Sequence, residues 1–210
     1  ESDANVGFEW IGARNHLGEG RRGRPTDDDQ RTRGANFTSA DFLVRFRDGR
    51  GRVQAVLGEW KYTECYPMGA NMRWSQRGTD RLATYGPHLG RAKLLGRAGV
   101  LSEELFFDPF DQLMRLQLLA WHMERVREQD AQIVSVLHVA PARNTELMGR
   151  ITSPGLARLG ASVHEVWSAI APPGRFLGVS FEQLVDVATT AAIPSGETGW
   201  SQWMRKRYLP

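Results

Sequence analysis

Cysteine is nearly absent from this chain of 210 residues, in which Cys65 is the single thiol. One thiol excludes an internal disulfide and a cysteine-rich zinc site. Long hydrophobic runs are absent too, and the longest, such as residues 116–121, fall far short of a membrane span. The chain opens on Glu1 without an initiator methionine or a signal-peptide pattern, so we expect a fragment or a processed product. These absences predict a protein without a membrane partner, in a reducing bacterial cytoplasm.

Lysine is the second scarcity. Only Lys61, Lys93 and Lys206 are lysines among the 27 basic residues, and the others are arginines. A chain that uses guanidinium groups so consistently is expected to keep an ammonium where a compact point charge with an adjustable pKa is needed. Chance could preserve any one of the three. Lys61 is the lysine that lies in a motif.

Basic charge is concentrated in one segment. The formal net charge is only +3, which argues weakly for a polyanionic partner. Residues 66–100, however, contain one acidic residue, Asp80, against six basic ones. The pattern predicts either a phosphate-facing surface or a solvated connector whose arginines maintain solubility. The six are Arg73, Arg77, Arg81, Arg91, Lys93 and Arg97.

Length and composition, with 41% hydrophobic and 24% charged residues, predict one α/β domain over residues 1–210. Asp108-Pro109 begins a run that is apolar almost all round, the pattern of a buried helix with proline at its first position. Residues 132–139 follow as a nearly continuous apolar strand, and this order indicates a parallel crossover. Other expected elements are strands at 4–11, 163–170 and 176–179, a mobile surface loop at 17–37, and a helix from the Ser180 capping box to about residue 191.

The strongest local pattern is a β-hairpin formed by residues 40–47 and 52–62 around a short glycine-containing turn. Successive side chains on a strand point to opposite faces. Glu59 and Lys61 therefore share one face of the second strand. Whether Asp41 joins them depends on how the two strands pair.

Register decides this question. If Arg47 pairs with Val53, Asp41 falls directly opposite Glu59, with Cβ atoms about 5 Å apart. A loop shorter by one residue would turn Glu59 to the other face of the sheet. Two carboxylates at that distance repel each other unless a positive charge lies between them, and a hard cation such as Mg²⁺ is a suitable one.

These residues resemble the bipartite motif of the PD-(D/E)xK restriction-endonuclease-like superfamily. Asp41 ends the first half of the motif, and Glu59-Trp60-Lys61 forms the second half; the usual proline before the aspartate is replaced by Ala40. The resemblance implies an α/β fold with an αβββαβ core, a central mixed β-sheet flanked by helices. It covers roughly residues 4–140, with the first helix absent or upstream, and residues 141–210 would complete the sheet with further strands and helices.

The resemblance also implies a function, that of an Mg²⁺-dependent DNA endonuclease that hydrolyses the backbone through a metal-activated water. Asp41 and Glu59 would hold Mg²⁺, or Mn²⁺ in its place, together with the Trp60 carbonyl. Lys61 would position the nucleophile or stabilise the charge of the transition state. Gln117, on the helix after the hairpin, would approach the site as a further catalytic residue. The implied partner is DNA, with RNA not excluded and a homodimer compatible.

Alternatives stay open at this stage. Lys61 could merely neutralise Glu59 in a surface ion pair, and Gln117 could be a buried amide bonded to the backbone. The chain could be a noncatalytic nucleic-acid-binding or assembly module that keeps a nuclease-like fold. Cys65 could act with a histidine, His88 or His122, although no spacing signature links them. Two further carboxylates, whose role the sequence leaves undecided, are Glu9 and Glu64.

Overall fold

The computed structural model describes residues 5–20, 25–32, 37–75, 78–94, 98–192 and 199–208. Two residues of the predicted basic segment, Arg77 and Arg97, lie outside the described residues. Parts of the segment predicted as a loop, 21–24 and 33–36, lie outside them as well.

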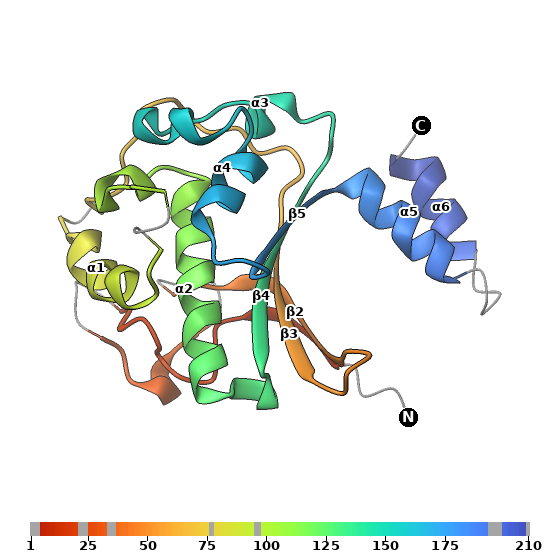
Figure 1. Ribbon diagram of the computed structural model, residues 1–210, viewed down its shortest axis with the longest axis horizontal. Coiled ribbons are helices and arrows are strands. Elements are labelled where there is room, and N and C mark those ends of the chain that lie inside the picture. Colours follow the sequence, from red (N-terminus) through yellow and green to blue (C-terminus); the bar gives the residue numbers. More distant parts are fainter. Residues whose placement is uncertain are drawn as a thin grey trace.

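The described chain forms a five-stranded mixed sheet in the order β1-β2-β3-β4-β5 (Figure 1). β1, β2 and β3 are antiparallel neighbours, whereas β4 pairs in parallel with both β3 and β5. A helical connection leads from β3 to β4, so the predicted parallel crossover and central mixed sheet are confirmed. The strands are β1 (Asn5–Trp10), β2 (Ala40–Arg47), β3 (Val53–Trp60), β4 (Ile133–Ala140) and β5 (Phe176–Ser180).

Helices cover the sheet unevenly. α2 packs along one face of the sheet, which we call the inner face, with α1 and α4 beside it. α5 and α6 project from the far end of β5 (Figure 1). No helix in the described ranges combines the length and apolarity that a membrane crossing requires. The longer helices are α1 (Arg81–Arg91), α2 (Phe110–Val126), α4 (Val163–Ile170), α5 (Phe181–Ala192) and α6 (Gly199–Tyr208), and α3 (Thr145–Met148) is a single turn.

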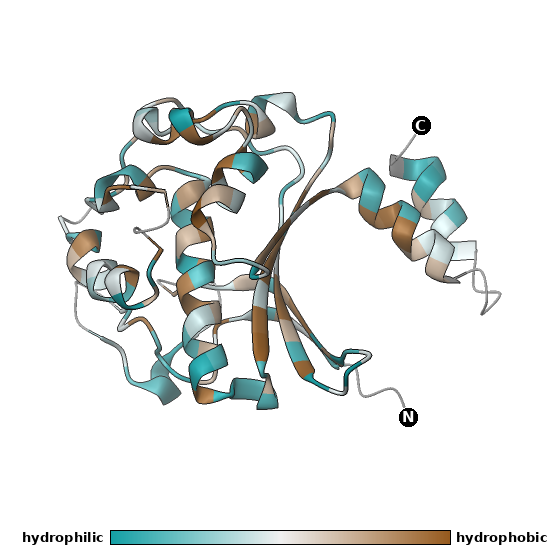
Figure 2. Ribbon diagram, in the orientation of Figure 1, coloured by the Kyte–Doolittle hydropathy of each residue, from teal (hydrophilic) through white to brown (hydrophobic). Residues whose placement is uncertain are grey.

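The buried helix expected after Asp108-Pro109 is α2. It begins at Phe110, with Pro109 as its N-cap residue rather than its first helical residue, and no side chain caps it. Ten of its residues are buried, because it lies between the sheet and the outer helices. Its buried apolar residues form one hydrophobic core with β3 and β4, and Figure 2 shows hydrophobic and hydrophilic residues in turn along α2.

The strand predicted at residues 163–170 is wrong, because this segment is the helix α4. Ser162 is its N-cap, and its side-chain Oγ accepts a hydrogen bond from the Glu165 backbone N–H at 3.2 Å. The Glu165 carboxylate accepts a further hydrogen bond from the backbone N–H of Ala161, the residue before the N-cap, at 2.7 Å. The buried positions Val163, Val166, Trp167 and Ile170 follow helical spacing, which the β-branched residues had obscured.

The helix from the Ser180 capping box is confirmed, because Ser180 and Gln183 exchange reciprocal side-chain-to-backbone hydrogen bonds of 2.8 and 3.1 Å.

The segment 17–37 is not wholly a surface loop. Leu17 is 2% exposed and Glu19 is 7% exposed, and Glu19 accepts hydrogen bonds from Thr38 and from the Tyr85 hydroxyl.

The predicted register of the β2–β3 hairpin is confirmed, since Arg47 pairs with Val53 and Phe42 pairs with Gly58. The Asp48 side chain stabilises the turn by accepting from the backbone N–H groups of Arg50 and Arg52, at 2.9 and 3.0 Å. Continuing the same pairing by one residue places Asp41 opposite Glu59.

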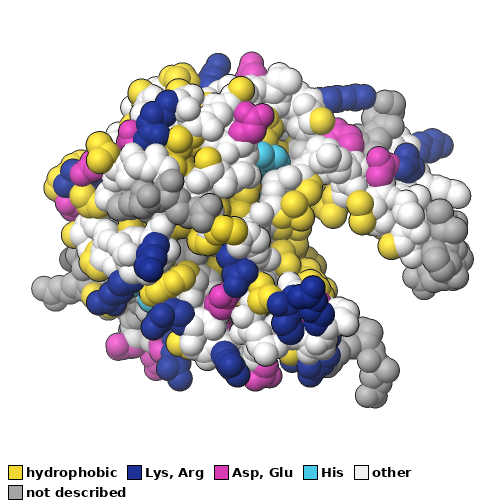
Figure 3. Space-filling view, in the orientation of Figure 1, with side chains coloured by type: hydrophobic (Ala, Val, Ile, Leu, Met, Phe, Trp, Pro, Cys, Tyr) yellow, Lys and Arg dark blue, Asp and Glu magenta, His cyan; other side chains and the backbone are white. Residues whose placement is uncertain are grey.

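The outer face of β1 and β2 is apolar and uncovered by the described helices. Val6 and Phe8 on β1 are 60% and 67% exposed, and Phe42 and Phe46 on β2 are partly exposed. Figure 3 shows hydrophobic side chains lining the hollow between the sheet and the projecting α5–α6 pair. The charged residues of the hairpin therefore lie on the face that α2 covers.

Asp111 on α2 links this helix to α1, and its substitution should destabilise the fold. Its fully buried carboxylate accepts from Arg81 at 2.6 Å and from Arg115 at 3.1 Å. We expect Asp111→Asn to lower the free energy of unfolding in urea by about 3 kcal/mol, because it leaves largely buried guanidinium groups without a counter-charge. The control, Glu103→Gln, removes a 3.8 Å pair with 53% exposure and should cost less than about 1 kcal/mol. Equal losses would contradict this role for Asp111.

Candidate active site

The structure brings Asp41, Glu59, Trp60 and Lys61 together. The hairpin register places Asp41 opposite Glu59 on the inner face of the sheet. Asp41 Oδ2 accepts a hydrogen bond of 2.6 Å from the Trp60 backbone N–H, which ties the first carboxylate to the strand that carries the second. Lys61 Nζ lies 2.5 Å from Glu59 Oε1. The Lys61 backbone N–H donates to Val139 O at 2.8 Å, which fixes the end of β3 against β4.

Burial makes this cluster electrostatically unusual. Glu59 is only 6% exposed and Lys61 only 8% exposed. Burial raises the pKa of Glu59, and the charge of Asp41 raises it further, against the opposing effect of Lys61. Burial would lower the pKa of Lys61, but the Glu59 carboxylate outweighs it and the net shift is upward. The pair is therefore a desolvated ion pair rather than the exposed surface pair of the simplest alternative.

Asp41 adds a second carboxylate to the cluster, and the charge of Lys61 offsets it only in part. Burial raises its pKa, and the nearby carboxylates Glu9 and Glu64 contribute in the same direction. The hydrogen bond from Trp60 and the charge of Lys61 oppose this shift without reversing it. The site thus gathers acidic oxygens whose repulsion a cation would relieve.

The chemistry of these donors fits a hard divalent cation. Two carboxylates and the main-chain oxygen of Trp60 are oxygen ligands of the kind that Mg²⁺ and Mn²⁺ accept. Within the described ranges, no group of three or more His, Cys, Asp or Glu side chains could hold a metal ion. An ion at this site would therefore depend on the backbone carbonyl and on water or phosphate oxygens for its other ligands, as Mg²⁺ commonly does.

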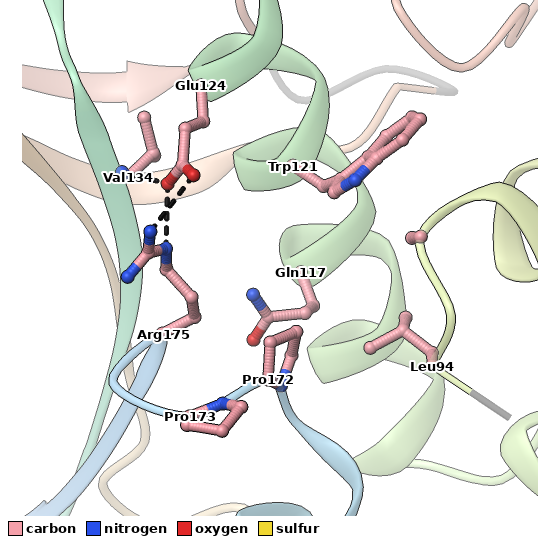
Figure 4. Close-up of a pocket in the computed structure, with 9 residues that line it drawn as sticks. Leu94, Gln117, Trp121, Glu124, Val134, Pro172, Pro173 and Arg175 are labelled. Carbon is pink, nitrogen blue, oxygen red and sulfur yellow. Dashed lines mark hydrogen bonds and ion pairs between the residues drawn. The ribbon is translucent and has the colours of Figure 1, made fainter. Parts of the chain in front are cut away.

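Gln117 faces a pocket to which the other predicted residues do not contribute. It lines this pocket of about 210 Å³ together with Trp121, Glu124 and Arg175, and none of Asp41, Glu59 or Lys61 lines it. Figure 4 shows its amide pointing from α2 toward Pro172 and the ion pair of Glu124 with Arg175. Gln117 is buried, as the alternative of a buried amide expected, and its Oε1 has no hydrogen-bond partner among the described residues.

Three residues near the site were not identified from the sequence. The charge of Arg115 on α2 opposes the rise in the pKa of Glu59 that burial causes, whereas the sequence pointed to Gln117 as the polar residue of interest on this helix. Tyr66 is electrostatically coupled to Lys61 and receives a 3.3 Å hydrogen bond from Gln112. His138 on β4 pairs in register with Glu59. No local pattern marks His138, because only the β3–β4 pairing brings it beside the hairpin.

The other candidates are arranged as follows. Glu9 accepts from the Ser39 hydroxyl at 3.1 Å, and Glu64 accepts from the Tyr62 backbone N–H at 2.6 Å. Cys65 is exposed, and its hydrogen bond to Glu146 raises the pKa of the thiol, which disfavours the nucleophilic thiolate. His88 and His122 contact each other at 2.8 Å instead.

The predicted basic segment is partly engaged within the protein. Arg73 pairs with Asp80 and Glu103, and Arg81 pairs with the buried Asp111. Arg91 and Lys93, at the end of α1, are exposed. The described part of the segment therefore combines structural ion pairs with exposed positive charge, and a phosphate-facing surface stays a prediction for its exposed residues.

The class of protein follows from the mixed sheet, the crossover helix and the cluster of Asp41, Glu59 and Lys61: it is restriction-endonuclease-like. Residues 1–209 match the model of the protein family described as "Restriction Endonuclease associating with ARP". The chain belongs to this family. No curated protein and no solved structure matches the chain.

The buried pair predicts a pH-dependent loss of stability in Lys61→Met. Removing Lys61 leaves Glu59 buried without its counter-charge, so the pKa of Glu59 should rise further above its value of about 4.3 in the unfolded chain. A carboxyl whose pKa is higher in the folded state favours folding when protonated, so stability is lost as pH rises from the unfolded toward the folded pKa. At pH 8 we expect a loss of about 3 kcal/mol in urea unfolding, which shrinks as the pH falls.

The double variant Glu59→Gln/Lys61→Met provides the control for this pH dependence. It lacks both charges, so the difference between the single and the double variant isolates the ionisation of Glu59. If that difference is the same at every pH, Glu59 does not have a raised pKa in the folded variant.

Proposed function

We propose that this protein is an Mg²⁺-dependent phosphodiesterase, a DNA endonuclease that hydrolyses the phosphodiester backbone. The observation that supports it most directly is the placement of Asp41 opposite Glu59, with Lys61 2.5 Å from Glu59, on one face of the sheet. Mn²⁺ can replace Mg²⁺ at such a site, because both accept carboxylate and carbonyl oxygens. Membership in a family described as a restriction endonuclease agrees with this activity.

The residues divide the chemistry between binding and charge stabilisation. Asp41, Glu59 and the Trp60 carbonyl would hold the cation, and the Trp60 backbone N–H orients Asp41 by donating to its Oδ2. When bound, the ion supplies Lewis-acid chemistry: it neutralises phosphate charge and makes water more acidic. Lys61 orients the attacking water and stabilises the negative charge that grows on the phosphate oxygens. The water oxygen bonds to phosphorus as the bond from phosphorus to the leaving sugar oxygen breaks; the proton lost by the water passes to solvent, solvent protonates the leaving oxygen, and no covalent enzyme intermediate forms.

Lysine is the feature that favours phosphate chemistry over other uses of two carboxylates. A glycosidase also needs paired carboxylates, but a buried ammonium next to Glu59 suits a dianionic transition state better than an oxocarbenium ion. DNA is the partner that we propose, and RNA remains a second substrate to be tested. We also extend to this chain the association with ARP that the family description names; the exposed apolar face around Val6 and Phe8 offers a surface for a protein contact.

A metal-dependent nicking assay tests the activity. We expect supercoiled plasmid to be nicked or linearised with Mg²⁺ or Mn²⁺ and to stay intact with EDTA. Lys61→Ala should reduce cleavage by at least about 100-fold, since it removes one stabilising charge from the transition state. Lys206→Ala, which changes an exposed lysine on α6, is the matched control and should cleave like the unmodified protein.

DNA binding, measured separately by gel shift over a range of salt concentrations, distinguishes the rival function. A noncatalytic binding module would bind with the same salt dependence and cleave under no metal condition. Cleavage that persists in Lys61→Ala, or that does not need a divalent cation, would overturn the proposed site.

A further inference from the structure

His138 lies beside the proposed site without a role in it. It stands on β4 in register with Glu59 on β3, and its side chain points to the same inner face of the sheet as the buried Val134 and Val136. The residue is fully buried. Its imidazole is therefore a polar group enclosed next to the ion pair of Glu59 and Lys61.

One side of this imidazole is fixed by α4. His138 Nδ1 lies 2.9 Å from His164 Nε2, within hydrogen-bond distance. The His164 ring sits above Gly178 on β5, where a Cβ atom would come within 2.3 Å of the ring, so the glycine provides the room that His164 occupies. The edge-on contact with Phe176, with ring centroids 6.1 Å apart, holds the ring from the other side.

The other side of the imidazole is unsatisfied. His138 Nε2 is buried and has no hydrogen-bond partner among the described residues. Leaving such a group without a partner costs about 1–3 kcal/mol. A neutral imidazole that donates its Nδ1 proton to His164 leaves a lone pair on Nε2. The positive charge of Lys61 acts on His138 and favours this tautomer, because the lone pair rather than an N–H then faces the positive field.

We propose that His138 is a positioning residue whose Nε2 accepts a hydrogen bond from the Lys61 ammonium when Glu59 serves as a ligand of a divalent cation. This inference rests on the proposed function. In the structure, Glu59 Oε1 is paired with Lys61 at 2.5 Å. With the Glu59 oxygens engaged by a cation, the Lys61 ammonium loses its partner and is repelled by the positive ion, so it needs another acceptor among the buried groups around it. The unsatisfied Nε2 is the buried acceptor that would meet this need.

A double-mutant cycle on metal binding tests the proposal without any turnover. Mn²⁺ affinity is measured by calorimetry in the absence of DNA for the unmodified protein, His138→Leu, Lys61→Met and the double variant. Without His138, Lys61 keeps competing for Glu59, so we expect His138→Leu to weaken Mn²⁺ binding about 10-fold. In the Lys61→Met background no ammonium competes, and the same substitution should change the affinity less than about 2-fold.

His138→Gln is the conservative control, because its side-chain oxygen can accept from Lys61, and its Mn²⁺ affinity should stay within about 3-fold of the unmodified protein. Equal weakening by His138→Leu in both backgrounds, or in neither, would overturn the proposal. Absence of Mn²⁺ binding in every protein would refute the metal site itself, and the inference with it.

A measurement on the unmodified protein avoids any dependence on how the variants fold. The ¹⁵N NMR signal of His138 Nε2 is expected at the shift of an unprotonated ring nitrogen and should move toward a hydrogen-bonded value on Mg²⁺ addition, while Nδ1 stays protonated. A protonated Nε2, or a signal that does not respond to Mg²⁺, would contradict the role assigned to His138.

Discussion

The register of the β2–β3 hairpin is the constraint on which the site depends. Because side chains alternate between the faces of a strand, a slip of one residue would turn Glu59 and Lys61 away from Asp41. The turn prevents this slip through the Asp48 carboxylate, which bonds two backbone N–H groups, the Arg52 side chain and the Gln54 amide. A surface turn thus controls the geometry of a buried site about seven residues away along each strand.

Placing charged groups on the covered face of the sheet is costly, and the structure shows how the cost is contained. Glu59 and Lys61 compensate each other, Asp111 is held between Arg81 and Arg115, and the apolar residues of α2 fill the remaining space. Buried ion pairs seldom stabilise a protein more than apolar residues of the same size would. Their presence at this position therefore agrees better with a chemical role than with a structural one.

Part of this arrangement could be predicted and part could not. The hairpin, the apolar helix α2, the strand β4 and the capping box at Ser180 have strong local signals, and each was predicted correctly. The helix α4 was mistaken for a strand, because its Val, Ile and Trp residues favour strands, although its buried positions follow helical spacing and Ser162 caps it. Gln117 was correctly placed on α2, but the direction of its side chain depends on how that helix is rotated against the sheet.

Signals from neighbouring residues specified the alternation of β2 and β3 and the turn at Asp48, but they left two hairpin registers open, of which one pairs Asp41 with Glu59. The tertiary fold has that register, and it set which face of the hairpin α2 covers, so that Glu59 and Lys61 are desolvated while Phe8 is exposed. It also decided that His138 stands beside Glu59. The reason is physical: hydrogen bonding along the chain fixes local geometry, whereas burial and contacts between distant strands depend on how the whole chain packs.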